Sequence, residues 1–252
     1  MQYHLETIPV WEAMEQNGGC PLCALHHKCE AAEVERSLGG SVMEPDARIR
    51  VNEKGICAKH HNQLFLLQNR LGHALLVDSH SKELLQKLER IARLTPAAQQ
   101  RRGLFAPKAY NADALIAQLH ALTQTCVICE AVDEHMTRYI YTFLHLWKTD
   151  TAFRERWESS NGVCIPHSAA LLQAAKEHLS AQKQQAFAAS LLTLLQRTLT
   201  QDEHDLEWFT LKFDYRNHDK PWGNSKNALE RTINHLRGQC VGEDKKEQGQ
   251  AL

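Results

Sequence analysis

The sequence has few of the residues that interrupt helices and no excess of either charge. Its 252 residues include 12 glycines and 7 prolines, whereas alanine, leucine, glutamine, glutamate and lysine are abundant, which favours helix over sheet. Lysine and arginine number 29 against 30 for aspartate and glutamate, so there is no basic field to attract nucleic acid or anionic lipid. We therefore expect an all-α protein, and the charge balance gives no indication of nucleic-acid binding.

The sequence also lacks a long apolar run. No stretch approaches the roughly 18 apolar residues of a membrane span, and the first residues include His4, Glu6 and Glu12 where a secretion signal would be apolar. We therefore expect a cytoplasmic protein without a signal peptide or a membrane span. Because disulfides are rare in the cytosol, its 8 cysteines indicate metal or redox chemistry.

Cysteine and histidine define an internal repeat. Each copy has a C-x2-C motif and, 33 or 34 residues later, a C-x2-H motif. The eight residues are Cys20, Cys23, Cys57 and His60 in the first copy and Cys126, Cys129, Cys164 and His167 in the second. Apolar residues follow each motif at matching offsets, in steps of three and four that indicate helices. Cys29 and Cys240 have no counterpart, and we interpret them as ordinary thiols.

The spacing of these motifs predicts two zinc ions per chain. Residues three apart in the first turn of a helix lie on one face and can bind one ion together, and the positive helix N-terminus favours thiolates. Zinc takes four ligands tetrahedrally from thiolate and imidazole. Three cysteines and one histidine fill all four positions, so we expect structural rather than catalytic zinc.

Three assignments stay open in the sequence. A C-x2-C pair is also typical of thioredoxin-like redox sites, and iron–sulfur clusters use similar ligands, although the paired C-x2-H motifs favour zinc. Alignment of the copies favours His60 over His61, because His167 is followed by Ser168. Two helix starts could close a hairpin within one repeat, but the spacing also permits sites formed between the C-x2-C of one repeat and the C-x2-H of the other.

The repeat predicts the domain organisation. We expect a first zinc-binding helical repeat over residues 1–94, a linker over 95–110 and a second repeat over 111–200, followed by a C-terminal aromatic and polar extension over 201–240 and a flexible tail over 241–252. The linker is short and the long helices carry apolar stripes, so we expect the two zinc-closed repeats to pack together.

A second candidate site lies in the C-terminal extension, where aromatic and charged residues alternate between Glu207 and Trp222. One hypothesis is a lid whose aromatic side chains fill the core and whose charges pair at the surface. The other is a binding pocket lined by Lys212, Asp214 and Arg216. In that pocket Asp214 would position the cations, and the planar guanidinium of Arg216 would bind an anionic group.

Several stretches resemble a bacterial family defined by a domain of unknown function. They are residues 3–11, 20–23, 39–46, 55–57 with His60, 69–72 and 212–217. The similarity covers nearly the whole chain, and some members carry the label of ABC-transporter substrate-binding protein. The resemblance implies no particular activity.

The sequence contains no nucleophile elbow, P-loop, dinucleotide fingerprint or H-E-x-x-H motif. We therefore favour a binding or adaptor module in which zinc-closed helices present a surface to a protein partner or a small ligand. The alternatives are an enzyme of unknown reaction with a polar site near the C-terminal extension, and a thiol or zinc sensor.

Overall fold

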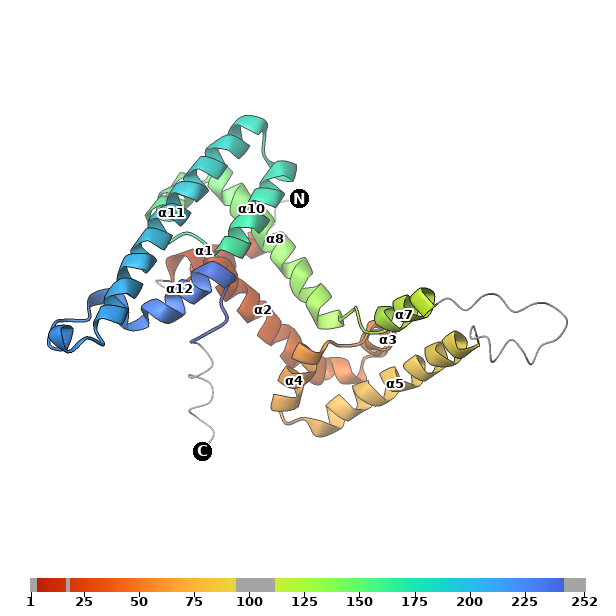
Figure 1. The fold of residues 1–252 in the computed structure, drawn as a ribbon. Helices are drawn as coiled ribbons and strands as arrows, with labels where there is room; N and C mark the ends of the chain where they lie inside the picture. Colours follow the sequence, from red (N-terminus) through yellow and green to blue (C-terminus); the bar gives the residue numbers. More distant parts are fainter. Residues whose placement is uncertain (1–3, 17–18, 94–111, 243–252) are drawn as a thin grey trace. The chain divides into compact units, whose positions relative to one another are not determined.

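The computed structural model describes residues 4–16, 19–93 and 112–242 (Figure 1). These residues form helices and connecting turns and no strand, which confirms the all-α prediction. The predicted linker over 95–110 and nearly all of the predicted tail over 241–252 lie outside the described residues. Within the described ranges, none of the helices combines the length and the apolar character that a membrane crossing requires.

The order of the helices repeats along the chain. The first part contains α1 (His4–Glu15), α2 (Pro21–Leu38), η1 (Gly40–Met43), α3 (Pro45–Lys54), α4 (Ala58–Leu66) and α5 (Arg70–Ala92). The second part contains α7 (Ala112–Ala121), α8 (Val127–Thr149), α9 (Thr151–Ser159), α10 (Ile165–His178), α11 (Ala181–Leu211), η3 (Tyr215–Asn217), η4 (Gly223–Asn227) and α12 (Ala228–Arg237). In each part, a long helix after the C-x2-C motif is followed by a shorter helix and then by a helix that begins at the C-x2-H motif.

The chain forms two compact units, and each unit contains residues of both repeats. The first unit is Met1–Lys28 with His135–Leu252, and the second is Cys29–Glu134. The boundaries fall inside α2 and α8, so each of these helices contributes residues to both units.

Four aromatic residues from α8, α9 and α11 form the centre of the first unit. Phe143, Phe153, Trp157 and Phe187 are fully buried. The ring centroid of Phe143 lies 5.1 Å from that of Phe153 and 5.3 Å from that of Trp157, in edge-to-face geometry. Trp157 Nε1 donates a hydrogen bond to Ser190 Oγ at 3.0 Å, so the buried indole keeps its polar atom satisfied. This cluster holds together the helices that precede and follow α10.

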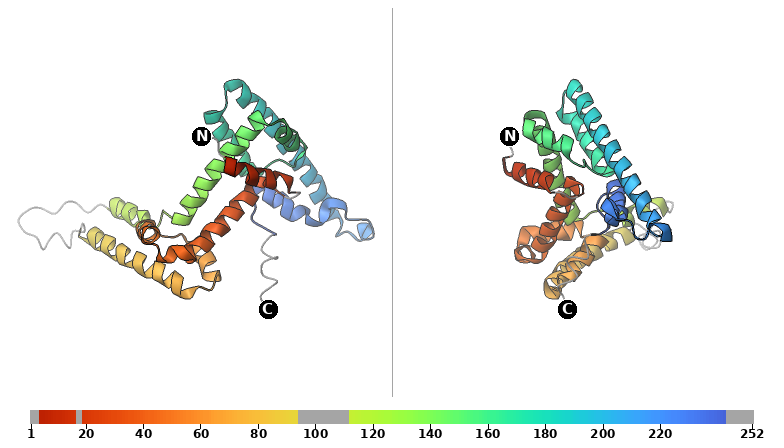
Figure 2. Two further views of the ribbon diagram at one scale, coloured as in Figure 1. Left: turned by 180° about the vertical axis from the view of Figure 1, so that it is seen from behind. Right: turned by 90° about the vertical axis from the view of Figure 1, so that its left-hand side faces the viewer.

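Helices α10, α11 and α12 of the first unit contact one another, as the views in Figures 1 and 2 show. A charged clamp fixes α12 on α11. Arg231 Nε lies 2.8 Å from Asp202 Oδ1, Arg231 Nη2 lies 2.6 Å from Asp205 Oδ2, and His235 Nδ1 also contacts Asp202. Burial raises the pKa of Asp202, but hydrogen bonds from His235 and Arg231 outweigh this and hold the pKa below its usual value. Both carboxylates are buried, and the clamp supplies the partners that buried charges require.

In the second unit, α3 lies against α5, and Asn69 fixes the corner between α4 and α5. Asn69 Oδ1 accepts a hydrogen bond from Gly72 N at 3.0 Å, and Asn69 Nδ2 donates to the Leu38 carbonyl at 2.9 Å. A Cβ atom at Gly72 would lie 2.8 Å from Asn69 Nδ2, so only glycine leaves room for this cap. The corner brings Leu64 of α4 and Leu76 of α5 into the buried interior.

Replacement of Trp157 by alanine is expected to destabilise the protein by about 3–5 kcal/mol, because it leaves a cavity in the aromatic cluster. Urea unfolding followed by circular dichroism measures this change. Leu192→Ala on α11 is the matched control, because Leu192 is 54% exposed and its loss should change stability by less than about 0.5 kcal/mol. Equal midpoints for the two variants would contradict the assignment of the core.

Candidate metal centres and the C-terminal segment

All four motif pairs lie at helix starts in the same way. The first residue of each pair directly precedes a helix, and the second lies in its first turn. Cys57 and Cys164 have extended backbones and are the N-cap residues of α4 and α10, and Cys20 and Cys126 directly precede α2 and α8. Each pair therefore presents two side chains on one side of a helix N-terminus, as a shared ion requires.

Two glycines turn the chain into the C-x2-H helices. Gly55 and Gly162 precede Cys57 and Cys164 by two residues and have φ angles of 74° and 69°, in the left-handed region. A Cβ atom at Gly55 would also lie 2.8 Å from His80 Nε2. Glycine adopts this conformation without the steric cost of a side chain, so these turns fix the direction in which each C-x2-H helix begins.

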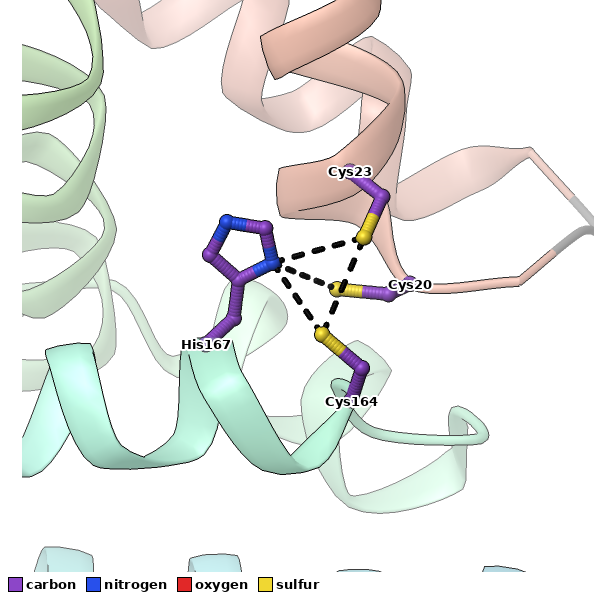
Figure 3. Close-up of side chains that lie close together, drawn as sticks. All are labelled: Cys20, Cys23, Cys164 and His167. Atoms are coloured by element: carbon purple, nitrogen blue, oxygen red, sulfur yellow. Dashed lines mark hydrogen bonds between the residues drawn. The ribbon is translucent and has the colours of Figure 1, made fainter. Parts of the chain in front are cut away.

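Cluster 1 consists of Cys20, Cys23, Cys164 and His167 (Figure 3). His167 Nδ1 lies 3.4 Å from the Sγ atoms of both Cys20 and Cys23. It lies 3.2 Å from Cys164 Sγ, and the sulfurs of Cys23 and Cys164 are 3.7 Å apart. The three cysteines are buried and the histidine is half-buried. Four potential ligand atoms thus converge on one point in the first unit.

Cluster 2 consists of Cys57, His60, Cys126 and Cys129, all in the second unit. His60 Nδ1 lies 3.2 Å from Cys57 Sγ, 3.3 Å from Cys126 Sγ and 3.5 Å from Cys129 Sγ. The sulfurs of Cys57 and Cys129 are 3.8 Å apart. His60 and Cys126 are buried, whereas Cys57 and Cys129 are half-buried, so solvent reaches cluster 2 more readily than the cysteines of cluster 1.

The geometry of both clusters fits a tetrahedral metal ion. Metal–sulfur bonds of about 2.3 Å at tetrahedral angles place two sulfurs about 3.8 Å apart, which agrees with the sulfur–sulfur distances of 3.7 and 3.8 Å. Burial and the neighbouring sulfurs of Cys164 and Cys23 raise the pKa of the Cys20 thiol well above its usual value. A divalent cation reverses this effect by stabilising thiolates. Both clusters could therefore hold a metal ion.

Each cluster combines the C-x2-C motif of one repeat with the C-x2-H motif of the other. The hairpin closed within a single repeat is therefore not the arrangement that forms. In each repeat the helix that follows the C-x2-C motif is longer than the helix that precedes the C-x2-H motif: α2 has 18 residues and α3 has 10, while α8 has 23 and α9 has 9.

The structure brings His60, and not the adjacent His61, into cluster 2. His61 Nδ1 instead lies 2.8 Å from His73 Nε2, and the two rings stack.

A short segment next to the cluster also joins the two repeats: Thr125 Oγ1 donates to the Lys54 carbonyl at 2.6 Å, and Val127 N donates to the Gly55 carbonyl at 3.1 Å. These bonds dock the start of α8 onto the turn that begins α4.

Among the predicted pocket residues, Lys212 holds a loop of the backbone in place. It is buried at the end of α11, and its Nζ atom donates to three backbone carbonyl oxygens between residues 217 and 220, each at 2.6 or 2.7 Å. An ammonium group has three protons, so all of them are used to hold this loop and none is left for a ligand.

Asp214 and Arg216 pair with each other. Arg216 Nη2 lies 2.6 Å from Asp214 Oδ2, and hydrogen bonds from Arg216 hold the pKa of Asp214 below its usual value. Phe213 and Tyr215 beside them are 75% and 87% exposed. An open hollow of about 610 Å³ is lined only by α11 residues between Thr193 and His204 and does not include this segment. A ligand role for Asp214 and Arg216 stays a prediction.

Glu30 also belongs to the site of cluster 2, although none of the sequence motifs indicates it. Its Oε1 atom accepts hydrogen bonds from Lys59 Nζ at 2.6 Å and from His60 Nε2 at 3.0 Å. Burial raises the pKa of Glu30, but these hydrogen bonds outweigh burial and lower the pKa to about 2. Glu30 lies two helical turns beyond Cys23 in α2. This position in the sequence does not indicate its contact with His60, which belongs to the C-x2-H motif.

The fold and the clusters define the class: an all-helical protein with two groups of three cysteines and one histidine, each of which could hold a metal ion. The chain matches the model of a family described as a family of unknown function (DUF6062) over residues 1–243, and it belongs to that family. This confirms the resemblance that the sequence motifs indicate. No curated protein and no solved structure matches the chain.

Cys20→Ser and Cys126→Ser are each expected to lower the bound metal from two ions to one per chain and to reduce thermal stability severely. A structural metal contributes on the order of 10 kcal/mol, which is similar to the total stability of a typical domain. Elemental analysis and thermal melting measure both effects. Cys240→Ser, at an exposed thiol, is the control and should leave both values unchanged. Similar losses in all three variants would count against the clusters.

Proposed function

We propose that this protein is a helical binding module whose fold is closed by two structural zinc ions, and that it works in the cytoplasm, where its thiols stay reduced. The observation that carries this proposal is the complete ligand set in each cluster. Three thiolates and one imidazole in tetrahedral positions favour zinc over harder cations. The protein supplies all four ligands, which leaves no coordination position for a substrate or for water.

Each zinc ion would join two helix starts that lie far apart in the sequence. In cluster 1 these are the starts of α2 and α10, and in cluster 2 they are the starts of α4 and α8. Metal ligation of this kind contributes directly to folding, because the unfolded chain has no preformed site. The zinc ions therefore hold a scaffold, and recognition takes place elsewhere on the surface.

The C-terminal segment is the best-supported recognition surface. Phe213, Tyr215 and Arg216 are strongly exposed, and tyrosine and arginine are enriched among the residues that dominate binding interfaces. The loop beneath them is held by Lys212 and by the hydrogen bond from Trp208 Nε1 to a backbone carbonyl at 3.1 Å. Asp214 neutralises Arg216, so a protein surface fits this segment better than a small anion.

Joint replacement of Phe213 and Tyr215 by alanine is expected to weaken capture of a protein partner at least about tenfold, since exposed aromatic anchors dominate such interfaces. Quantitative affinity capture with full-length protein measures the effect, and zinc content and melting temperature should not change. Leu192→Ala removes an exposed apolar side chain from α11 and serves as the control. Unchanged capture by the double variant would remove this segment from the proposal.

A second candidate function, thiol or zinc sensing, is favoured by the half-buried Cys57 and Cys129 of cluster 2. Chelator titration separates the two functions. For structural zinc, we expect two zinc ions per chain by elemental analysis and a loss of helical circular dichroism as each ion leaves. A sensor would release the ion of cluster 2 first and keep its helicity. Iron in place of zinc would contradict both functions, and a purified, correctly folded protein that binds no metal would contradict structural zinc.

A further inference from the structure

Glu30 places a buried carboxylate behind the histidine of cluster 2. The residue is 4% exposed, and its Oε1 atom lies 3.0 Å from His60 Nε2. On the other side of the same imidazole ring, Nδ1 faces the three sulfurs of cluster 2 at 3.2 to 3.5 Å. The carboxylate, the imidazole and the sulfur atoms therefore form one continuous line of contacts.

We propose that Glu30 is a positioning residue for the metal of cluster 2. By accepting a hydrogen bond from Nε2–H of His60, Glu30 fixes the tautomer in which Nδ1 carries a free lone pair toward the sulfurs. It also fixes the plane of the ring, and its negative charge makes the imidazole a stronger ligand. This inference rests on the proposed function, because it requires a metal ion in cluster 2.

The surroundings of Glu30 hold the carboxylate in place for this role. Lys59 Nζ lies 2.6 Å from Oε1, and Gln63 Nε2 lies 3.3 Å from Oε2, so both oxygens are engaged. Lys59, His60 and Gln63 all belong to α4. A buried charge is stable only with such partners. His60 itself is 2% exposed, so water has little access to replace Glu30 as the acceptor of the Nε2 proton.

Cluster 1 has no corresponding carboxylate. Met136 stands at the position of the second repeat that corresponds to Glu30, and within the described residues no aspartate or glutamate pairs with His167. Instead, Gln239 N donates a hydrogen bond to Cys23 Sγ at 3.2 Å. The two clusters thus support their ligands differently, and loss of Glu30 should weaken cluster 2 alone.

The test measures metal release from each cluster separately in the full-length, zinc-loaded protein. Excess chelator is added, and pulses of N-ethylmaleimide label the thiols that have lost their metal. Peptide mass spectrometry then assigns the label. Label on Cys57, Cys126 and Cys129 reports cluster 2, and label on Cys20, Cys23 and Cys164 reports cluster 1.

In Glu30→Ala, cluster 2 should lose its metal about 10 to 100 times faster than in the wild type, while cluster 1 keeps its rate. Glu30→Gln should show a smaller increase, because the amide oxygen still accepts a hydrogen bond from Nε2–H but carries no charge. Glu33→Gln is the matched control on the same helix, where a buried carboxylate pairs with Arg36 at 3.1 Å, and it should leave both rates unchanged.

Nitrogen NMR of the His60 ring provides a readout that general destabilisation does not produce. The Nε2 proton resonance should persist in the wild type and Glu30→Gln and shift in Glu30→Ala. Wild-type release rates in Glu30→Ala would overturn the inference, as would equal acceleration at both clusters, which indicates a loosened helix. Absence of metal from cluster 2 of the wild type would instead refute the proposed function, and elemental analysis distinguishes that outcome.

Discussion

Three sulfur atoms and an imidazole nitrogen lie within 4.8 Å of one another at two places in this chain. Three thiolates at such distances repel one another, and burial adds to the cost of their charge. A cation between them replaces this repulsion with an attraction to each thiolate. The positions of the four motif-bearing helix starts follow from this requirement, because each cluster closes only when two of those starts meet.

Each cluster joins the C-x2-C motif of one repeat to the C-x2-H motif of the other. Within each repeat, the helix that follows the C-x2-C motif is longer than the helix that leads to the C-x2-H motif. Both compact units contain residues of both repeats. The clamp of Arg231 on Asp202 and Asp205, in contrast, fixes α12 on α11 within the second part of the chain.

The two clusters share their ligand types but differ in what surrounds them. In cluster 2, Glu30 supports the histidine, and two cysteines are half-buried. In cluster 1, the backbone at Gln239 supports a sulfur, and all three cysteines are buried. Lys212 is a charged residue with a structural position: its buried ammonium group donates hydrogen bonds to three carbonyl oxygens of one loop. Phe213 and Tyr215, which follow it in the chain, are exposed.

The sequence by itself determined the features that depend on local spacing. Its composition indicated helices, and the three-residue step of each motif placed Cys57 and His60, like the other pairs, in a first helical turn. The repeat alignment also selected His60 for the metal cluster rather than His61. These features need no tertiary information, because residues three apart in a helix share a face whatever surrounds the helix.

Only the tertiary structure decided which motifs meet and what supports them. The contact of Glu30 with His60 and the use of Lys212 by three carbonyls join residues on different helices or across a loop. Neither contact leaves a periodic signal in the sequence. Each depends on how far a helix carries the chain and on which neighbour its end then meets, and helix lengths and side-chain packing determine both.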